Sequence, residues 1–357
     1  MKLFTVGPVE MDPRTRELGN IALPYFRTPD FSKLMFELER NILELIDAPS
    51  NARAVLLTAS GSGAMESAVV SVFNRNDKLL IINGGTFGRR FADICAIHRI
   101  PYTEIHVPFE RDLILSDLEP FAASGYTGLL IQGHETSIGK QYDLKMVGDW
   151  CERQGLLLVA DCVSSFLTDE FSMRKMNVDV FFTASQKALA LPPGLSIVSC
   201  SERVLVDRLY APERVRGQLY LDLHDAFVNA ERGQTPFTPA LSIILQLDDR
   251  LKRILAAGGV TSELALCGKN AAYFRKRVER VTPFRIPTYR LSNGLTPLLT
   301  GPLDAHRLFL DLMERFGQVI TPCGGELANS LTRVGHMGYL KTEDYDRLIE
   351  CIGHVIV

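Results

Sequence analysis

A lysine and an aspartate stand at the ends of two predicted buried strands. Lys187 follows the apolar run 180–182, and Asp161 ends the apolar run 156–160. An amine at the end of a buried strand is costly to desolvate unless something uses it. Because the carboxyl ends of parallel strands meet at one edge of a sheet, both groups can reach a single ligand there.

This pair suits one class of cofactor. An amine forms a Schiff base with an aldehyde, and a carboxylate across a pyridine ring keeps the ring nitrogen protonated, so that the ring accepts electrons. The pair therefore predicts pyridoxal 5′-phosphate, with Lys187 and Asp161 as catalytic residues. The alternative is a buried ion pair with no catalytic use.

Further segments that follow predicted strands supply small, aromatic or polar side chains. Residues 59–66 (Ala-Ser-Gly-Ser-Gly-Ala-Met-Glu) can bring backbone N–H groups to a phosphate, although an ordinary strand-to-helix turn has the same pattern. Phe87, among glycines, can lie against a planar cofactor or fill a turn. His134 is either a ligand contact or a half-buried histidine with satisfied hydrogen bonds.

The elements that must position these residues alternate between strand and helix over residues 50–260. The strands are continuous apolar runs, as burial on both faces of a mostly parallel sheet requires, and this predicts an α/β fold with helices on both sides. Helices are predicted at 65–73, 144–154, 239–257, 261–281, 305–316 and 342–353. The predicted strands are 54–58, 79–83, 102–107, 128–132, 156–161, 178–183 and 195–200.

Changes in the pattern of predicted strands and helices along the chain divide it into three parts. Residues 1–25 form an N-terminal segment that packs near the active site or the small domain. Residues 26–260 form a large cofactor-binding domain. Residues 261–357 supply a helical connection and a smaller C-terminal α+β domain.

The composition of the chain excludes some classes of partner and indicates where in the cell the protein is expected. The chain has 357 residues, 46% hydrophobic content and a formal net charge of −3, so no basic footprint for nucleic acid is present. No apolar run approaches the roughly 20 residues that span a bilayer, and the first residues do not resemble a signal peptide. The seven cysteines lack a Cys-x-x-Cys pair. We therefore expect a cytoplasmic protein without membrane, nucleic-acid or metal partners.

Taken in order along the chain, the motifs resemble those of the class V, fold-type I pyridoxal-phosphate aminotransferases. The chain is most similar to the alanine/serine–glyoxylate (or pyruvate) and 2-aminoethylphosphonate–pyruvate transaminases. The motifs are Ser-Gly-Ser-Gly (60–63), Gly-x-Phe-Gly-x-Arg (85–90), His-Glu-Thr-Ser-x-Gly (134–139), Asp-x-Val-Ser-Ser (161–165), Ser-Gln-Lys (185–187), Thr-Pro-Phe-Thr-Pro (235–239) and Arg-Val-Gly-His-Met-Gly (333–338).

The resemblance implies a role for each site residue. Lys187 would hold the cofactor as a Schiff base and shuttle the proton, Asp161 would pair with the pyridinium nitrogen, and Arg333 would grip the substrate carboxylate. The other implied cofactor contacts are Phe87 on the ring, Thr136 near the ring hydroxyl, Ser62, Gly63 and Gln186 on the phosphate, and Thr235 and Thr238 on the phosphate of the neighbouring subunit in a homodimer with shared sites.

Two departures from the family leave substrate preference open. Phe87 stands where relatives often carry Trp or Tyr, and Ala64 stands where relatives can carry a polar residue beside the phosphate. Arg27 places a second cation near the start of the chain, either to bind a distal phosphonate or carboxylate of the substrate or to make a surface ion pair.

The reaction implied is a ping-pong amino transfer from a small amino acid, alanine- or serine-like, to a small 2-oxo acid such as pyruvate or glyoxylate. The alternative within the family is a 2-aminoethylphosphonate–pyruvate transaminase. A lyase of the cysteine desulfurase kind would need a nucleophilic cysteine on a mobile loop, for which Cys323 is the candidate. A non-catalytic binding protein on the same fold is the remaining alternative.

Overall fold

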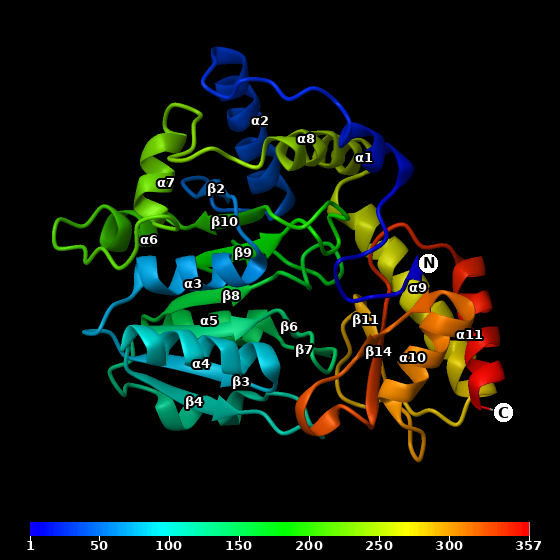
Figure 1. Ribbon diagram of the computed structural model, residues 1–357. Helices are drawn as coiled ribbons and strands as arrows, with labels where there is room; N and C mark the ends of the chain where they lie inside the picture. The colour runs from blue at the N-terminus through cyan, green and yellow to red at the C-terminus, as the bar shows by residue number, and fades with distance from the viewer. Residues whose placement is uncertain (357) are drawn as a thin grey trace.

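A seven-stranded sheet forms the centre of the computed structural model, which describes residues 1–356 (Figure 1). Strand β10 runs antiparallel to both of its neighbours, and the other neighbouring strands are parallel. The expected mostly parallel α/β sheet is therefore confirmed. In spatial order the strands are β2 (Arg53–Leu57), β10 (Ser196–Cys200), β9 (Val180–Ala184), β8 (Leu157–Asp161), β5 (Gly128–Gln132), β3 (Leu79–Asn83) and β4 (Tyr102–His106).

Helices cover both faces of the sheet because its strands are apolar on both sides. In β3, Leu80 and Ile82 belong to one hydrophobic cluster, whereas Leu79 and Ile81 belong to another. The first cluster includes side chains of α2 (Pro29–Leu45), α5 (Leu144–Gln154) and α8 (Leu241–Ala256). The second includes side chains of α3 (Gly61–Val72), α4 (Thr86–His98) and α7 (Leu223–Ala230). Alternate residues of a strand therefore face opposite helical layers.

The C-terminal part has a separate apolar cluster. It contains side chains of the long helix α9 (Val260–Val281), of α10 (Ala305–Phe316) and of α11 (Thr342–Ile356). These helices accompany an antiparallel sheet of β11 (Leu295–Leu299), β14 (Leu331–Gly335) and β13 (Thr321–Pro322). The predicted division at residues 26 and 261 remains a prediction.

The start of the chain lies beside this C-terminal part (Figure 1). Strand β1 (Lys2–Leu3) pairs in parallel with β12 (Gln318–Val319). Phe4 is fully buried in the C-terminal cluster with Tyr345. The remaining short elements are α1 (Pro13–Leu18), β6 (His134–Glu135), β7 (Lys140–Gln141), α6 (Glu202–Val204), 3-10 turns at Leu115–Asp117, Glu119–Phe121 and Gly325–Leu327, and a π turn at Leu205–Leu209.

One boundary that matters for the site differs from the sequence prediction. Helix α3 begins at Gly61, whereas the sequence predicted a helix from Met65. The hydroxyl of Ser60 accepts a hydrogen bond from the Gly63 N–H at 3.4 Å and so caps the helix. The small residues that we expected to precede the helix therefore form its first turn.

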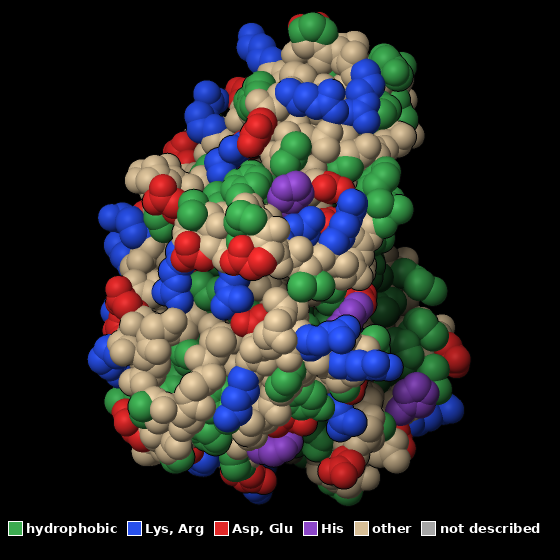
Figure 2. All heavy atoms as spheres, turned by 90° about the vertical axis from the view of Figure 1, so that its left-hand side faces the viewer, with side chains coloured by type: hydrophobic (Ala, Val, Ile, Leu, Met, Phe, Trp, Pro, Cys, Tyr) green, Lys and Arg blue, Asp and Glu red, His purple; other side chains and the backbone are tan. Residues whose placement is uncertain are grey.

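On the face that Figure 2 shows, the surface has no large patch of a single charge. Lysine, arginine, aspartate and glutamate side chains are interspersed there with hydrophobic ones. Within residues 1–356, we find no helix of the length and apolarity that a bilayer crossing requires.

Candidate active site

A pocket opens at the carboxyl edge of the sheet, where the chain leaves several strands in turn. It has a cavity volume of about 120 Å³ and lies at the start of α3 and α4 and at the ends of β8 and β9. Open α/β sheets bind ligands at this edge. The lining residues are Ser60, Gly61, Ser62, Met65, Phe87, Arg90, Thr136, Asp161, Val163, Ser164, Gln186 and Lys187.

The amine of Lys187 is held at the wall of this pocket by the N-terminal segment. Its Nζ donates a hydrogen bond to the Val6 carbonyl at 2.5 Å. A Cβ on Gly7 would lie 2.5 Å from Cδ of Lys187, and Gly7 has a φ of +126°, so only glycine fits beside the lysine. Burial lowers the pKa of Lys187 to about 8; Asp161 acts against this shift, while Arg333 and Arg90 add to it.

The carboxylate of Asp161 ends β8 and is buried. Oδ1 accepts a hydrogen bond from the Val163 N–H at 2.9 Å. Burial raises the pKa of Asp161 to about 6, against the opposing effects of the Val163 N–H and the Lys187 charge. The structure therefore brings the predicted acid and amine into one pocket with pKa values shifted toward each other.

Thr136 and Arg333 connect the pocket to the C-terminal sheet. The Thr136 hydroxyl donates to the Ser164 hydroxyl at 2.9 Å, and the Thr136 carbonyl accepts from Nη1 of Arg333 at 3.0 Å. Nη2 of Arg333 donates to the Pro322 carbonyl at 2.6 Å, and its buried Nε has no hydrogen-bond partner among residues 1–356. Arg333 comes from β14, so two parts of the chain meet at this site.

The first turn of α3 forms another side of the pocket. Ser62 lines it, and Gly63 follows in the same turn. Nη1 of Arg90 donates to the Ser62 hydroxyl at 2.8 Å. Gln186 also lines the pocket, and its buried Oε1 has no partner in the described chain.

Thr235, Thr238 and Arg27 do not line this pocket. The Thr235 hydroxyl donates to the Phe237 carbonyl at 2.7 Å, and Thr238 is exposed. Arg27 donates to Oε1 of Gln234 at 3.1 Å and to the Thr235 carbonyl at 2.9 Å rather than making an ion pair. The roles expected for these three residues remain predictions.

Two further candidates are held by hydrogen bonds outside the pocket. Nδ1 of His134 lies 3.0 Å from Oδ2 of Asp169, an arrangement that agrees with a packed histidine better than with a ligand contact. The backbone N–H of Cys323 bonds to the Leu331 carbonyl at 3.2 Å, directly after β13. A cysteine that continues a strand pair differs from the mobile nucleophile that a desulfurase requires.

Sequence reasoning did not assign Glu135, Arg90 or Ser164 to the site. The buried Glu135 carboxylate accepts hydrogen bonds from the backbone N–H groups of Phe87, at 3.2 Å, and Gly88, at 3.0 Å, at the start of α4. All three residues belong to the motifs quoted above. Their roles depend on contacts between different motifs, which spacing along the chain does not show.

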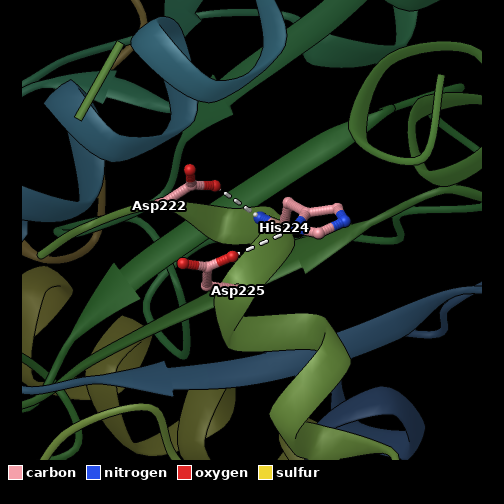
Figure 3. Close-up of side chains that lie close together, drawn as sticks. All are labelled: Asp222, His224 and Asp225. Carbon is pink, nitrogen blue, oxygen red and sulfur yellow. Dashed lines mark hydrogen bonds and ion pairs between the residues drawn. The ribbon is translucent and has the colours of Figure 1, made fainter. Parts of the chain in front are cut away.

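One group of acidic and histidine side chains has the compactness of a metal site. The possible ligand atoms of Asp222, His224 and Asp225 lie within 4.8 Å of one another at the start of α7 (Figure 3). Both terminal nitrogens of the Arg214 guanidinium group contact Asp222, and Arg216 pairs with both carboxylates. Since two arginines already neutralise the acids, we interpret the group as an ion-pair network.

The comparisons with known proteins agree with this geometry. Residues 25–217, more than half of the chain, match the family described as aminotransferase class-V. The chain belongs to this family. It is 26% identical over 350 residues to an L-aspartate–glyoxylate aminotransferase of Paracoccus denitrificans, covering 95% of this chain and 86% of the relative.

Two further proteins named as aminotransferases match almost the whole chain. A 2-aminoethylphosphonate–pyruvate transaminase of Pseudomonas putida is 25% identical over 364 residues, covering 99% of this chain and 96% of the relative. The crystal structure of an alanine–glyoxylate aminotransferase from Nostoc sp. superposes with a TM-score of 0.93 at 25% identity, covering 99% of this chain and 95% of that one. The protein is therefore a pyridoxal-phosphate-dependent transaminase of fold type I.

The pocket residues fit this cofactor. The amine of Lys187 lines the cavity together with the buried carboxylate of Asp161, as an aldehyde-bearing pyridine ring requires. The helix start at Gly61 and the side chain of Gln186, whose amide nitrogen can donate to a phosphate, border the same cavity. Helix N-termini favour phosphate groups.

Proposed function

We propose that this class V aminotransferase moves an amino group from a small amino acid, alanine- or serine-like, to a small 2-oxo acid such as pyruvate or glyoxylate in a ping-pong reaction. The observation that carries the proposal is that Lys187 and Asp161 line one pocket, while Arg333 donates to the carbonyl of Thr136, a residue of the same pocket. An amine, an acid and a carboxylate clamp are the groups that amino transfer needs.

Lys187 serves as the covalent anchor of the cofactor and as the proton carrier. When bound, pyridoxal phosphate supplies an electron sink that accepts the electrons of the substrate Cα–H bond. Once the donor amine has displaced it, Nζ of Lys187 would take the proton from the substrate Cα and deliver it to C4′ of the cofactor. The pKa of about 8 suits both steps, because a neutral amine is available near pH 8 and its conjugate acid forms readily.

Asp161 and Arg333 hold the reacting groups in place. The Asp161 carboxylate would accept a hydrogen bond from the protonated ring nitrogen, and its buried position would strengthen that interaction. The two terminal nitrogens of Arg333 bond backbone carbonyls, while its Nε has no partner in the described chain, so the guanidinium group is fixed and retains donor capacity for a carboxylate.

The remaining assignments belong to the same proposal. Phe87 stacks on the ring, Thr136 bonds near its hydroxyl, and Ser62, Gly63 and Gln186 hold the phosphate. Thr235 and Thr238 serve the neighbouring subunit of a cytoplasmic homodimer. An exposed apolar group beside these threonines supports an interface: the rings of Tyr220 and Phe237 stack at 5.0 Å.

The test is a spectral half-reaction screen of the cofactor-loaded protein. Alanine, serine, aspartate and 2-aminoethylphosphonate are added in turn, without acceptor, and the absorbance band of the lysine-bound cofactor is followed. We expect alanine or serine to convert the band and Lys187→Ala to show none. The absence of a cofactor band in the wild-type protein would overturn the proposal.

The Pseudomonas putida relative supports one alternative, a 2-aminoethylphosphonate–pyruvate transaminase. Conversion of the band by 2-aminoethylphosphonate but by neither alanine nor serine would select it. Sulfide release from cysteine that disappears in Cys323→Ala would instead select the desulfurase reaction.

A further inference from the structure

Arg90 is a cation in the pocket that the reaction described above does not use. It lies on α4, one turn after Phe87, and its guanidinium carbon is 4.8 Å from the centre of the Phe87 ring. It lines the same cavity as Lys187 and contributes to the lowered pKa of that lysine. Its charge is therefore felt inside the pocket and not only at the surface.

The Arg90 guanidinium group has N–H donors that no side-chain acceptor of the described chain uses. Of its five N–H groups, the structure shows one side-chain hydrogen bond, from Nη1 to the Ser62 hydroxyl at 2.8 Å. Among residues 1–356, no carboxylate lies within ion-pair distance of Arg90. The neighbouring Arg89 differs, because it pairs with Asp93 on the outside of the same helix.

The contact with Ser62 locates this charge at the first turn of α3. There the backbone N–H groups of the turn and the positive end of the helix dipole favour an anion. Ala64, the next residue but one, is fully buried and has no polar group to add. The positively charged side chain that borders this turn in the pocket is thus supplied from α4, by Arg90.

We propose that Arg90 binds the dianionic phosphate of the cofactor and keeps the first turn of α3 oriented toward it through Ser62. This rests on the proposed function and deepens it, since it names the residue that balances the phosphate charge. Arginine suits this role because its planar fork can donate two parallel hydrogen bonds to phosphate oxygens. The cation–π contact with Phe87 holds the fork in place.

The test compares pyridoxal phosphate with pyridoxal, which has the same ring and aldehyde but no phosphate. Binding of each to the cofactor-free protein is titrated by absorbance for wild type, Arg90→Gln, Arg90→Lys and Arg89→Gln. We expect Arg90→Gln to reduce the preference for the phosphorylated ligand by roughly ten- to a hundredfold, with pyridoxal binding nearly unchanged. Arg90→Lys should lie between, and the matched control Arg89→Gln should equal wild type.

Each outcome decides a different question. An unchanged ligand preference in Arg90→Gln would overturn the phosphate assignment. If that variant instead loses the half-reaction with aspartate more than with alanine, Arg90 binds a distal anion of the substrate and the assignment is likewise wrong. If wild type binds neither ligand, the proposed function itself fails. Should Arg90→Gln fold poorly, the Arg90→Lys ratio alone decides, since a wild-type value there would contradict two-pronged binding.

Discussion

Asp161 combines a functional charge with a cost in stability. Burial raises its pKa from 3.8 to about 6, so the folded protein binds a proton more tightly there than the unfolded chain does. The contribution of this group to stability therefore falls as the pH rises between those two values, by about 3 kcal/mol. The buried charge that the cofactor needs therefore destabilises the cofactor-free protein.

We predict that Asp161→Asn stabilises the cofactor-free protein at pH 7 and removes amino transfer. The reason is that asparagine occupies the same space without a buried charge. Urea unfolding at several pH values measures this: the difference between variant and wild type should grow from about pH 4 to pH 6 and then level off. Parallel pH curves for the two proteins would contradict the raised pKa.

The lowered pKa of Lys187 predicts a second pH dependence, in the rate at which the protein reacts with an aldehyde. Since burial lowers its pKa to about 8, the neutral amine becomes abundant as the pH rises through 8 instead of near 10.5. The rate at which the cofactor-free protein reacts with pyridoxal should increase up to about pH 8 and change little above it. A rate that keeps rising beyond pH 9 would show an ordinary lysine.

The proposed role of Arg333 predicts that its replacement lowers activity with carboxylate-bearing donors more than with other amines. In Arg333→Lys the charge stays but the planar fork is lost, so kcat/KM for an amino acid donor should fall roughly ten- to a hundredfold. The half-reaction with ethylamine, which has no carboxylate, should change little. An equal loss with both donors would indicate a structural role for Arg333 instead.

At the scale of elements, Glu135 joins two segments of the site. Its carboxylate accepts N–H groups at the start of α4 and also the Ser137 N–H at 3.1 Å, so it fixes the turn that carries Phe87 to the segment that carries Thr136. In Glu135→Gln, the amide nitrogen would face some of these N–H donors and could not accept their hydrogen bonds. We expect the free energy of unfolding to fall by about 1–3 kcal/mol.

Urea unfolding of the cofactor-free protein checks this value. Glu170→Gln is the matched control, because Glu170 is exposed and no side-chain hydrogen bond is found for it within the described residues. A loss of the same size in both variants would contradict the capping role of Glu135.

The sequence was a good guide to the elements and a partial guide to the site. Each predicted strand is present within two residues, and the helices at 144–154 and 305–316 match, because continuous apolar runs and amphipathic repeats depend on burial alone. The start of α3 was missed because Ser60 caps a turn rich in small residues. The helix at 29–45 was missed as well.

At the scale of the molecule, the residues that were harder to predict are those that act across distant segments. Val6 and Gly7 contact Lys187, and Glu135 contacts Phe87, through folding that no local pattern encodes. Thr235 and Thr238 lie outside the pocket of their own chain, so their predicted roles depend on a second subunit.

A mixing experiment tests the shared site. Lys187→Ala and Thr238→Asp should each be inactive as homodimers, because one lacks the amine and the other brings a negative charge to the phosphate of its neighbour. Hybrids of the two would contain one intact site, so an exchanged equimolar mixture should recover about a quarter of wild-type activity. A mixture that stays inactive while hybrids are demonstrably present would exclude sharing through Thr238.

The pairing of β1 with β12 has a consequence for synthesis on the ribosome. The first strand must wait for residues 318–319 before it can pair, and the central sheet must wait for β10 before β2 gains its neighbour. The Val6 carbonyl that bonds the amine of Lys187 follows β1 directly. A nascent chain can therefore complete the surroundings of its reactive lysine only near the end of translation, after all strands of the sheet that carries the lysine have been synthesised.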